Sequence, residues 1–275
     1  MSNNVRITVL VDNTASRADL IAEHGLSILI DYEGKQILFD TSQSNAVMSN
    51  AQKLGVDLAC TDTIVISHGH YDHTGGLCAV LDTAPKAKIY LHPEAIQSRF
   101  SQKDLKAKYI GMSDSAKKAI EGCHVIWTTT PAYLFPGVAV TGQVPRTNDF
   151  EDVGGAFFLD ENCQKPDRLI DDQTLFIESS KGLVVILGCA HSGVVNILDY
   201  INKLTGREKI HAVIGGMHLL NAGQMRINKT IETLKKYDVQ KVIPLHCTGQ
   251  KVMEVLKNVF CDKCLLLGAG DKITF

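Results

Sequence analysis

A dense cluster of histidines restricts what this chain can fold into. The six residues from His68 to His73 hold three imidazoles and one carboxylate, and they come directly after the apolar run Thr63–Ser67. That run has the length and β-branched composition of a buried strand, and Gly75-Gly76 marks a sharp change of backbone direction soon afterwards. Such a polar cluster makes a poor core, whereas ions such as zinc accept neutral His nitrogens and Asp oxygens together. The sequence therefore predicts a divalent-metal site at the exit of a strand.

The spacing within the cluster favours two ions rather than one. His68 and His70 can point the same way from an extended segment, whereas the adjacent Asp72 and His73 cannot. An ion that works in catalysis usually keeps about three protein ligands and leaves room for water, so a two-ion site needs about six ligand positions. We therefore expect the rest of the chain to supply further ligands.

Histidines also follow predicted strands in the second half of the chain. His191, His218 and His246 each come after an apolar, β-branched run and before a helical pattern. We predict one ion held by His68, His70 and His191 and a second held by Asp72, His73 and His246. A hydroxide would bridge the two ions, which would lie roughly 3.5–4 Å apart.

The pattern H-x-H-x-D-H after a strand resembles the metallo-β-lactamase-fold superfamily of metal-dependent hydrolases. Strands and helices alternate in both halves of the chain, which fits an αββα sandwich, two mixed β-sheets packed face to face with helices outside. The resemblance implies the same fold, and we expect one domain over residues 1–275. Phe39-Asp40-Thr41 also matches the superfamily, in which this Asp supports the metal loop; Asp40 could equally be a simple helix cap.

Two departures from the superfamily pattern narrow the resemblance. Most members have a further histidine before the late hairpin and a bridging Asp where this chain has Cys189, but Thr141–Arg146 contains no histidine. His191 is then the expected substitute, and Cys189 either ligates as a thiolate, which would favour zinc, or simply packs. Together with Thr141–Arg146, the segments around Cys189, His218 and His246 resemble a branch often labelled dihydropterin ribofuranosylaminobenzene phosphate synthases, associated with methanopterin biosynthesis.

Composition excludes several other classes. The chain has 275 residues, 45% hydrophobic and 21% charged, with a net charge of −2, so it lacks the basic excess that attracts nucleic acid or an anionic membrane. Its first residues read as a strand and its longest apolar runs are far shorter than the roughly 20 residues of a membrane span. We expect a cytoplasmic protein that acts on a small molecule. The eight cysteines are predicted to be free thiols. Structural roles are expected for the pair Cys261 and Cys264 and for Cys60, Cys78, Cys123 and Cys163.

The segment 93–122 is polar and helical in pattern, with no strand expected before Val125. We predict a helical insertion on the surface. It could serve as a lid or as the arm of a homodimer, or remain an inert solvated helical pair.

The leading hypothesis is a dinuclear hydrolase of a small cytoplasmic ester, a phosphoester or phosphodiester. Its two divalent ions would be zinc, with iron or manganese as alternatives. Asp72 and His218 are the candidate catalytic residues, although His218 could be a structural histidine. Arg146 and Thr248 are candidate phosphate contacts, because Arg offers a bidentate fork and Thr248 precedes a helix; each could instead be a surface residue or a cap.

Two alternatives stay open. One is a transferase that joins a pterin diphosphate to an aryl amine, in which the metals stabilise the departing pyrophosphate. The other is a redox or iron-binding module in which cysteines hold the iron.

Overall fold

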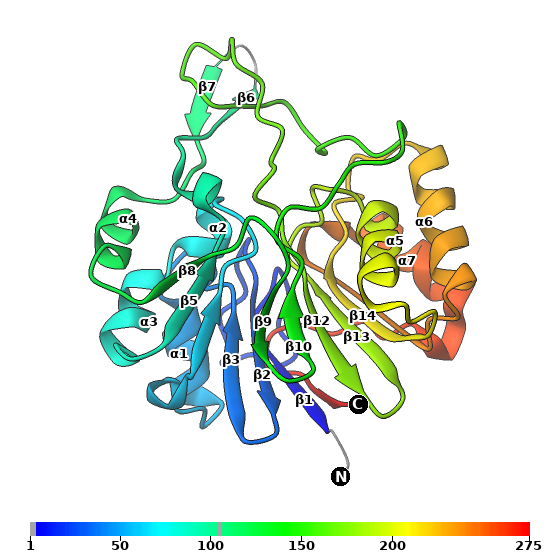
Figure 1. Ribbon diagram of the computed structural model, residues 1–275, viewed down its shortest axis with the longest axis horizontal. Coiled ribbons are helices and arrows are strands. Elements are labelled where there is room, and N and C mark those ends of the chain that lie inside the picture. Colours follow the sequence, from blue (N-terminus) through cyan, green and yellow to red (C-terminus); the bar gives the residue numbers. More distant parts are fainter. Residues whose placement is uncertain (1–3, 104–105) are drawn as a thin grey trace.

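Two β-sheets packed face to face form the centre of the computed structural model, which describes residues 4–103 and 106–275 (Figure 1). The first sheet runs in the order β16 (Lys272–Thr274), β1 (Val5–Val11), β2 (Ser27–Tyr32), β3 (Lys35–Phe39), β4 (Thr63–Val65), β5 (Lys88–Leu91) and β8 (Val125–Trp127). The second runs in the order β15 (Lys241–Leu245), β14 (Ile210–Gly216), β13 (Gly182–Leu187), β12 (Leu175–Ser179), β10 (Val138–Val140) and β9 (Ala132–Phe135).

Both sheets are mixed, and helices cover their outer faces. In the first sheet the strands from β3 to β8 are parallel and the others antiparallel; in the second, β13, β14 and β15 are parallel. Helices α1 (Ala46–Lys53), α3 (Leu77–Thr83) and α4 (Asp114–Ile120) flank the first sheet, and α5 (Val194–Thr205), α6 (Gln224–Lys236) and α7 (Gln250–Phe260) flank the second (Figure 1). The predicted αββα sandwich is confirmed.

Successive side chains of a central strand point to opposite faces of its sheet, so each strand contributes to two of the three apolar layers of the protein. In β13, Val184 and Ile186 belong to the core between the sheets, whereas Leu183, Val185 and Leu187 pack into the core under α5, α6 and α7. A strand buried on both faces needs a continuous apolar run of this kind. Each such side chain contributes about 1.5–3 kcal/mol on burial, so these central strands provide a rigid base for the loops at their ends.

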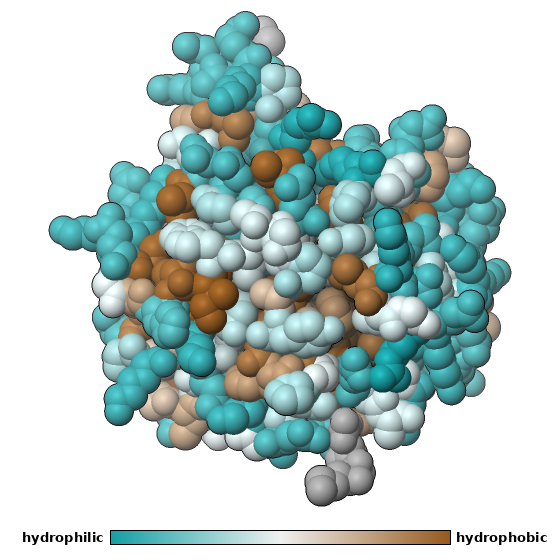
Figure 2. All heavy atoms as spheres, in the orientation of Figure 1, coloured by the Kyte–Doolittle hydropathy of each residue, from teal (hydrophilic) through white to brown (hydrophobic). Residues whose placement is uncertain are grey.

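The prediction of a helical insertion over 93–122 is wrong in its first half. A short 3₁₀ turn (Pro93–Ile96) is followed by a hairpin of β6 (Phe100–Lys103) and β7 (Lys106–Tyr109), and only then by α4. The hairpin pairs with β11 (Phe157–Phe158), about fifty residues further along the chain, so its pairing partner could not be seen locally. All four residues of β7 are exposed, and the hairpin projects from the sandwich with a mainly hydrophilic surface (Figures 1 and 2).

The candidate site lies where several strands end at the same edge. β3, β4 and β13 lead into the loops that carry Asp40, His68 and Cys189, and β14 and β15 lead into His218 and His246. Asp40, His218 and His246 all adopt positive φ angles of 46–58°, which L residues rarely adopt. Such strained backbone persists where the surrounding structure fixes it, and it is frequent at functional sites.

No helix within residues 4–103 and 106–275 combines the length and the apolar character that a membrane span requires.

Candidate metal centre

The first predicted trio comes together in the interior. The ligand atoms of His68, His70 and His191 lie within 4.8 Å of one another, and none of the three residues is more than 5% exposed. The Nδ1 of His191 donates to the carbonyl of Val153 at 2.7 Å, which leaves its Nε2 as a lone pair without a partner. The Nε2 of His70 is also buried without a partner. Unpaired buried nitrogens in such a close cluster are what a metal ion would satisfy.

The second trio converges beside the first. The Oδ2 of Asp72 lies 3.3 Å from Nε2 of His246 and 3.8 Å from Nε2 of His73, and these two nitrogens are 3.3 Å apart. The Nδ1 of His246 donates to Oδ1 of Asn13 at 2.9 Å, so its Nε2 faces Asp72. Asp12 accepts from the His246 amide at 2.7 Å and thereby holds the strained turn after β15.

Asp40 supports the metal loop, the segment from Ser67 to His73, rather than capping a helix. Its Oδ2 accepts from Nδ1 of His73 at 2.6 Å and from the Ser67 hydroxyl at 2.7 Å, while its Oδ1 accepts from the Ser67 amide. The helix α1 begins after Asn45 instead. The carboxylate fixes the tautomer and orientation of His73, which is the usual outer partner of a metal-binding histidine.

His24 is a candidate ligand that the sequence reasoning missed. Its Nε2 lies 3.0 Å from Oδ2 of Asp72, and it forms a potential ligand group with Asp72 and His246. Its side chain is 53% exposed, so it faces the open side of the second trio. His24 lies in an irregular segment between β1 and β2, where no strand exit or neighbouring ligand marks it.

The electrostatics of the first trio favour metal over protons. Burial, together with the neighbouring imidazoles, lowers the pKa of His68 and His191 well below the usual value. Burial and the charge of Arg99 do the same to the pKa of His70. These rings are therefore neutral at pH 7, and a metal ion need not displace protons from them.

The second trio carries the negative charge. Burial acts to raise the pKa of Asp72, but His73, His24 and His246 outweigh it and hold that pKa well below its usual range. Buried nitrogen donors, one ionised carboxylate and fixed tautomers fit divalent ions of the zinc type.

Cys189 faces this centre. Its Sγ lies 3.2 Å from Nε2 of His73, and burial raises the pKa of its thiol. It belongs to one potential ligand group with His68 and His73 and to another with His218 and Cys247. Neither Cys261 nor Cys264 belongs to any such group within the described ranges.

The predicted substrate contacts have other partners in this structure. Nη2 of Arg146 donates to the carbonyl of His191 at 2.6 Å, and Thr248 is fully buried, with its hydroxyl accepting from the Met217 amide at 3.1 Å. Their assignment to phosphate stays a prediction.

His218, the second candidate catalytic residue beside Asp72, packs against the first trio. Its ring centroid is 4.3 Å from that of His191, and its Nε2 donates to the carbonyl of Gly154 at 3.2 Å. Its Nδ1 is buried with no hydrogen bond. This position suits a group that acts beside the first ion, and its catalytic role stays a prediction.

Comparison with known proteins gives one consistent family. A family model described as the metallo-beta-lactamase superfamily matches residues 20–202. The 7,8-dihydropterin-6-methyl-4-(beta-D-ribofuranosyl)-aminobenzene-5'-phosphate synthase of Methanocaldococcus jannaschii is 32% identical over 99% of this chain and 97% of its own length. An uncharacterised protein of the same organism is also 32% identical, over 92% of this chain and 94% of its own. A solved structure described as a metal-dependent hydrolase of the beta-lactamase superfamily is 31% identical, with a TM-score of 0.85 and 98% of both chains covered.

Proposed function

This chain belongs to the metallo-β-lactamase superfamily, and we propose that it is a dinuclear metal-dependent hydrolase whose substrate is a small phosphoester or phosphodiester. The observation that carries the proposal is the convergence of two buried ligand trios, the first of which holds two nitrogens without a partner. Two divalent ions bound there supply an activated water at neutral pH and neutralise charge that develops on the ester oxygens. We assign zinc to the site, with iron or manganese as alternatives.

The chain's own groups prepare the site before any ligand arrives. The Val153 carbonyl and the Asp40 carboxylate hold His191 and His73 in the tautomers that present Nε2 inward. The ring of Phe157 lies 5.2 Å from that of His70 and 5.5 Å from that of His191, and so shields the first trio from water. A dry, fixed site strengthens the electrostatic interactions made with a reacting ester.

Metal content tests the ligand assignment. We expect about two ions per chain by elemental analysis of the purified protein, and fewer in the His68→Ala and His191→Ala variants. His124→Ala is the matched control, because His124 is exposed and belongs to none of the ligand groups. Unchanged metal content in His191→Ala would remove that residue from the site.

Activity tests the reaction class. The metal-loaded protein is assayed against phosphodiesters, phosphomonoesters, lactones and thioesters, and we expect turnover of a phosphate ester that is lost on chelation and restored by zinc. Absence of hydrolysis across this panel in fully loaded protein contradicts the proposal.

A second candidate has its own support, because the full-length relative from M. jannaschii is named as a synthase. In this alternative the protein joins a pterin diphosphate to an aryl amine. Native mass spectrometry with pterin diphosphates separates the two, since a hydrolase of unrelated esters would not retain them.

A further inference from the structure

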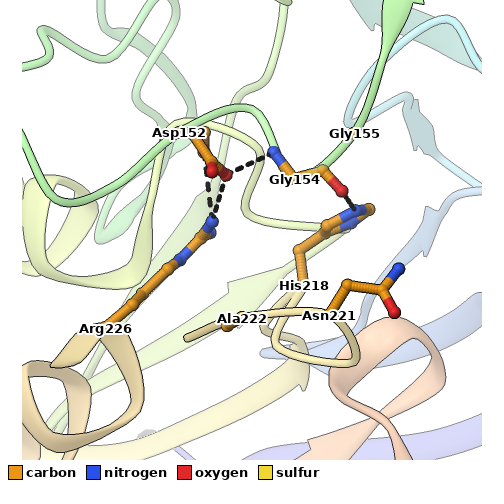
Figure 3. A pocket seen from close by; sticks show the side chains of 7 residues that line it. All are labelled: Asp152, Gly154, Gly155, His218, Asn221, Ala222 and Arg226. Atoms are coloured by element: carbon orange, nitrogen blue, oxygen red, sulfur yellow. Dashed lines mark hydrogen bonds and ion pairs between the residues drawn. The ribbon is translucent and has the colours of Figure 1, made fainter. Parts of the chain in front are cut away.

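A cavity of about 270 Å³ opens beside the first trio. Asp152, Gly154, His218, Asn221 and Arg226 are among the residues that line it (Figure 3). This volume lies slightly below the roughly 300–1,000 Å³ of a pocket that encloses a whole drug-sized ligand. It therefore suits one arm of a larger molecule.

Arg226 reaches the cavity from α6 with three of its five N–H donors unused. Its side chain is 6% exposed, and only Nη1 is paired, with Oδ1 of Asp152 at 2.8 Å and with the Asp152 carbonyl at 3.2 Å (Figure 3). Nε and Nη2 are buried with no partner. These two nitrogens form the side-on edge of the guanidinium, whose parallel N–H groups match two oxygens of a carboxylate or phosphate. A buried donor pair is costly unless a ligand completes it.

The charges around the cavity also favour an anion. The Asp152 side chain is 82% exposed, so water screens the carboxylate that faces Arg226. Among the lining residues Arg226 carries the only guanidinium, and Asp152 is the only acidic residue. Burial lowers the pKa of the neighbouring Arg146, the charge of Arg226 adds to this effect, and Asp172 opposes it. The buried guanidinium of Arg226 therefore faces one acidic group, which water screens.

The cavity also adjoins the place where chemistry would occur. His218 forms part of its wall and packs at 4.3 Å, centroid to centroid, on His191 of the first trio. Gly154 (φ +87°) permits this arrangement, because a Cβ there would lie 1.9 Å from the His218 ring. A group held by Arg226 would thus belong to the same substrate molecule that the metal centre engages.

We propose that this cavity is an oxyanion subsite in which the Nε–Nη2 edge of Arg226 binds a phosphate or carboxylate group of the substrate, remote from the bond that is cleaved. The proposal rests on the hydrolase function above only where it calls the bound molecule a substrate. The existence of the anion-binding site does not depend on that function.

Isothermal titration calorimetry of the metal-loaded, full-length protein with inorganic phosphate tests it. Phosphate held at the metal centre is common to all variants, so differences between them report the subsite. We expect Arg226→Gln to lose one phosphate-binding event or weaken it roughly 10- to 100-fold, the usual range for a charge-assisted bond. Asp152→Asn keeps an acceptor for the guanidinium but removes the competing charge, so it should bind phosphate more tightly.

Two variants with the same change of charge test the subsite even where Arg226→Gln fails to fold. Asn221 is exposed at the cavity, and Asn221→Asp should weaken phosphate binding by repulsion. Asn228→Asp makes the same change on the exposed part of α6 and should leave binding at the wild-type value. Equal phosphate affinity in Asn221→Asp and Asn228→Asp, or in the wild type and a folded Arg226→Gln, overturns the subsite.

A parallel titration with acetate separates the two sources of the anion. Acetate binding that depends on Arg226 assigns a carboxylate arm, and binding of phosphate alone assigns a phosphate arm. Because no titration requires turnover, a failed ester screen would contradict the hydrolase and leave the subsite standing. Unaltered phosphate binding in the Arg226→Gln and Asn221→Asp variants would contradict the subsite and leave the hydrolase function standing.

Discussion

Arg99 ties the hairpin segment to the metal loop, and its removal should destabilise the fold more than any surface ion pair. It is 1% exposed, and its Nη2 lies 2.7 Å from Oδ1 of Asp171, which is fully buried. The other oxygen of Asp171 accepts from the amide of Gly69, between two predicted ligands. Arg99→Met keeps most of the packing but leaves Asp171 charged, buried and without its cation.

The magnitude follows from this burial. Two unit charges about 4 Å apart interact by ~4 kcal/mol at an effective dielectric constant of about 20. Breaking a buried pair from one side usually costs about 3–5 kcal/mol. We therefore expect Arg99→Met to lower the free energy of unfolding by about 3–5 kcal/mol, with a fall in Tm of roughly 6–20 °C.

Urea denaturation followed by circular dichroism measures this loss, and two controls isolate its cause. Arg207→Met breaks a pair of the same 2.7 Å length with Glu178 that is 49% and 36% exposed, so it should cost no more than about 1 kcal/mol. Adding Asp171→Asn to Arg99→Met removes the nearer of the two carboxylates that lose their cation, while an amide oxygen still accepts from Gly69. The other carboxylate, Asp167, lies 3.5 Å from Nε of Arg99 and stays in both variants. The double variant should therefore be the more stable of the two, and a loss in Arg99→Met no larger than in Arg207→Met refutes the reasoning.

Three further results are expected. Asp40→Asn should weaken metal binding roughly 10- to 100-fold in a chelator competition, because it frees His73 to change tautomer; unchanged affinity contradicts this role. Burial raises the pKa of Asp172 to about 6, although the hydrogen bond that Asp172 accepts from the Ser192 amide opposes this rise. The folded metal-free protein then binds more protons than the unfolded chain between pH ~4 and ~6, and its stability should fall by up to about 3 kcal/mol as pH rises through that window. Urea melts of Asp172→Asn should lack this component. His24→Ala should lower the affinity for the second ion only, and equal loss of both ions argues against that placement.

The sandwich fold and the buried metal ligands could be predicted because short stretches of the sequence indicate both. An apolar, β-branched run as short as β13 indicates a strand buried on both faces, and the ligands follow such runs directly. His191 was expected in the first trio as the substitute for the histidine that Thr141–Arg146 lacks, and the structure places it beside His68 and His70.

The remaining features depend on contacts between distant segments. β6 lies in a polar stretch and pairs both with β7 and with β11, which follows about fifty residues later. His24 gains its importance from Asp72, which no local pattern links to it. Arg226 reads as an ordinary residue of an amphipathic helix until Asp152 and the cavity are placed beside it.

The irregular segment 148–173 therefore has more influence on the site than its sequence suggests. It supplies the carbonyl that orients His191, the ring of Phe157 over the first trio, and the carboxylate of Asp171 that holds the metal loop. Asp152 and Gly154 in the same segment line the cavity together with Arg226. The histidine cluster sets the chemistry, whereas this segment sets the space around it. From the proposed Arg226 subsite we therefore expect substitutions here and in α6 to change the substrate while every predicted metal ligand stays in place.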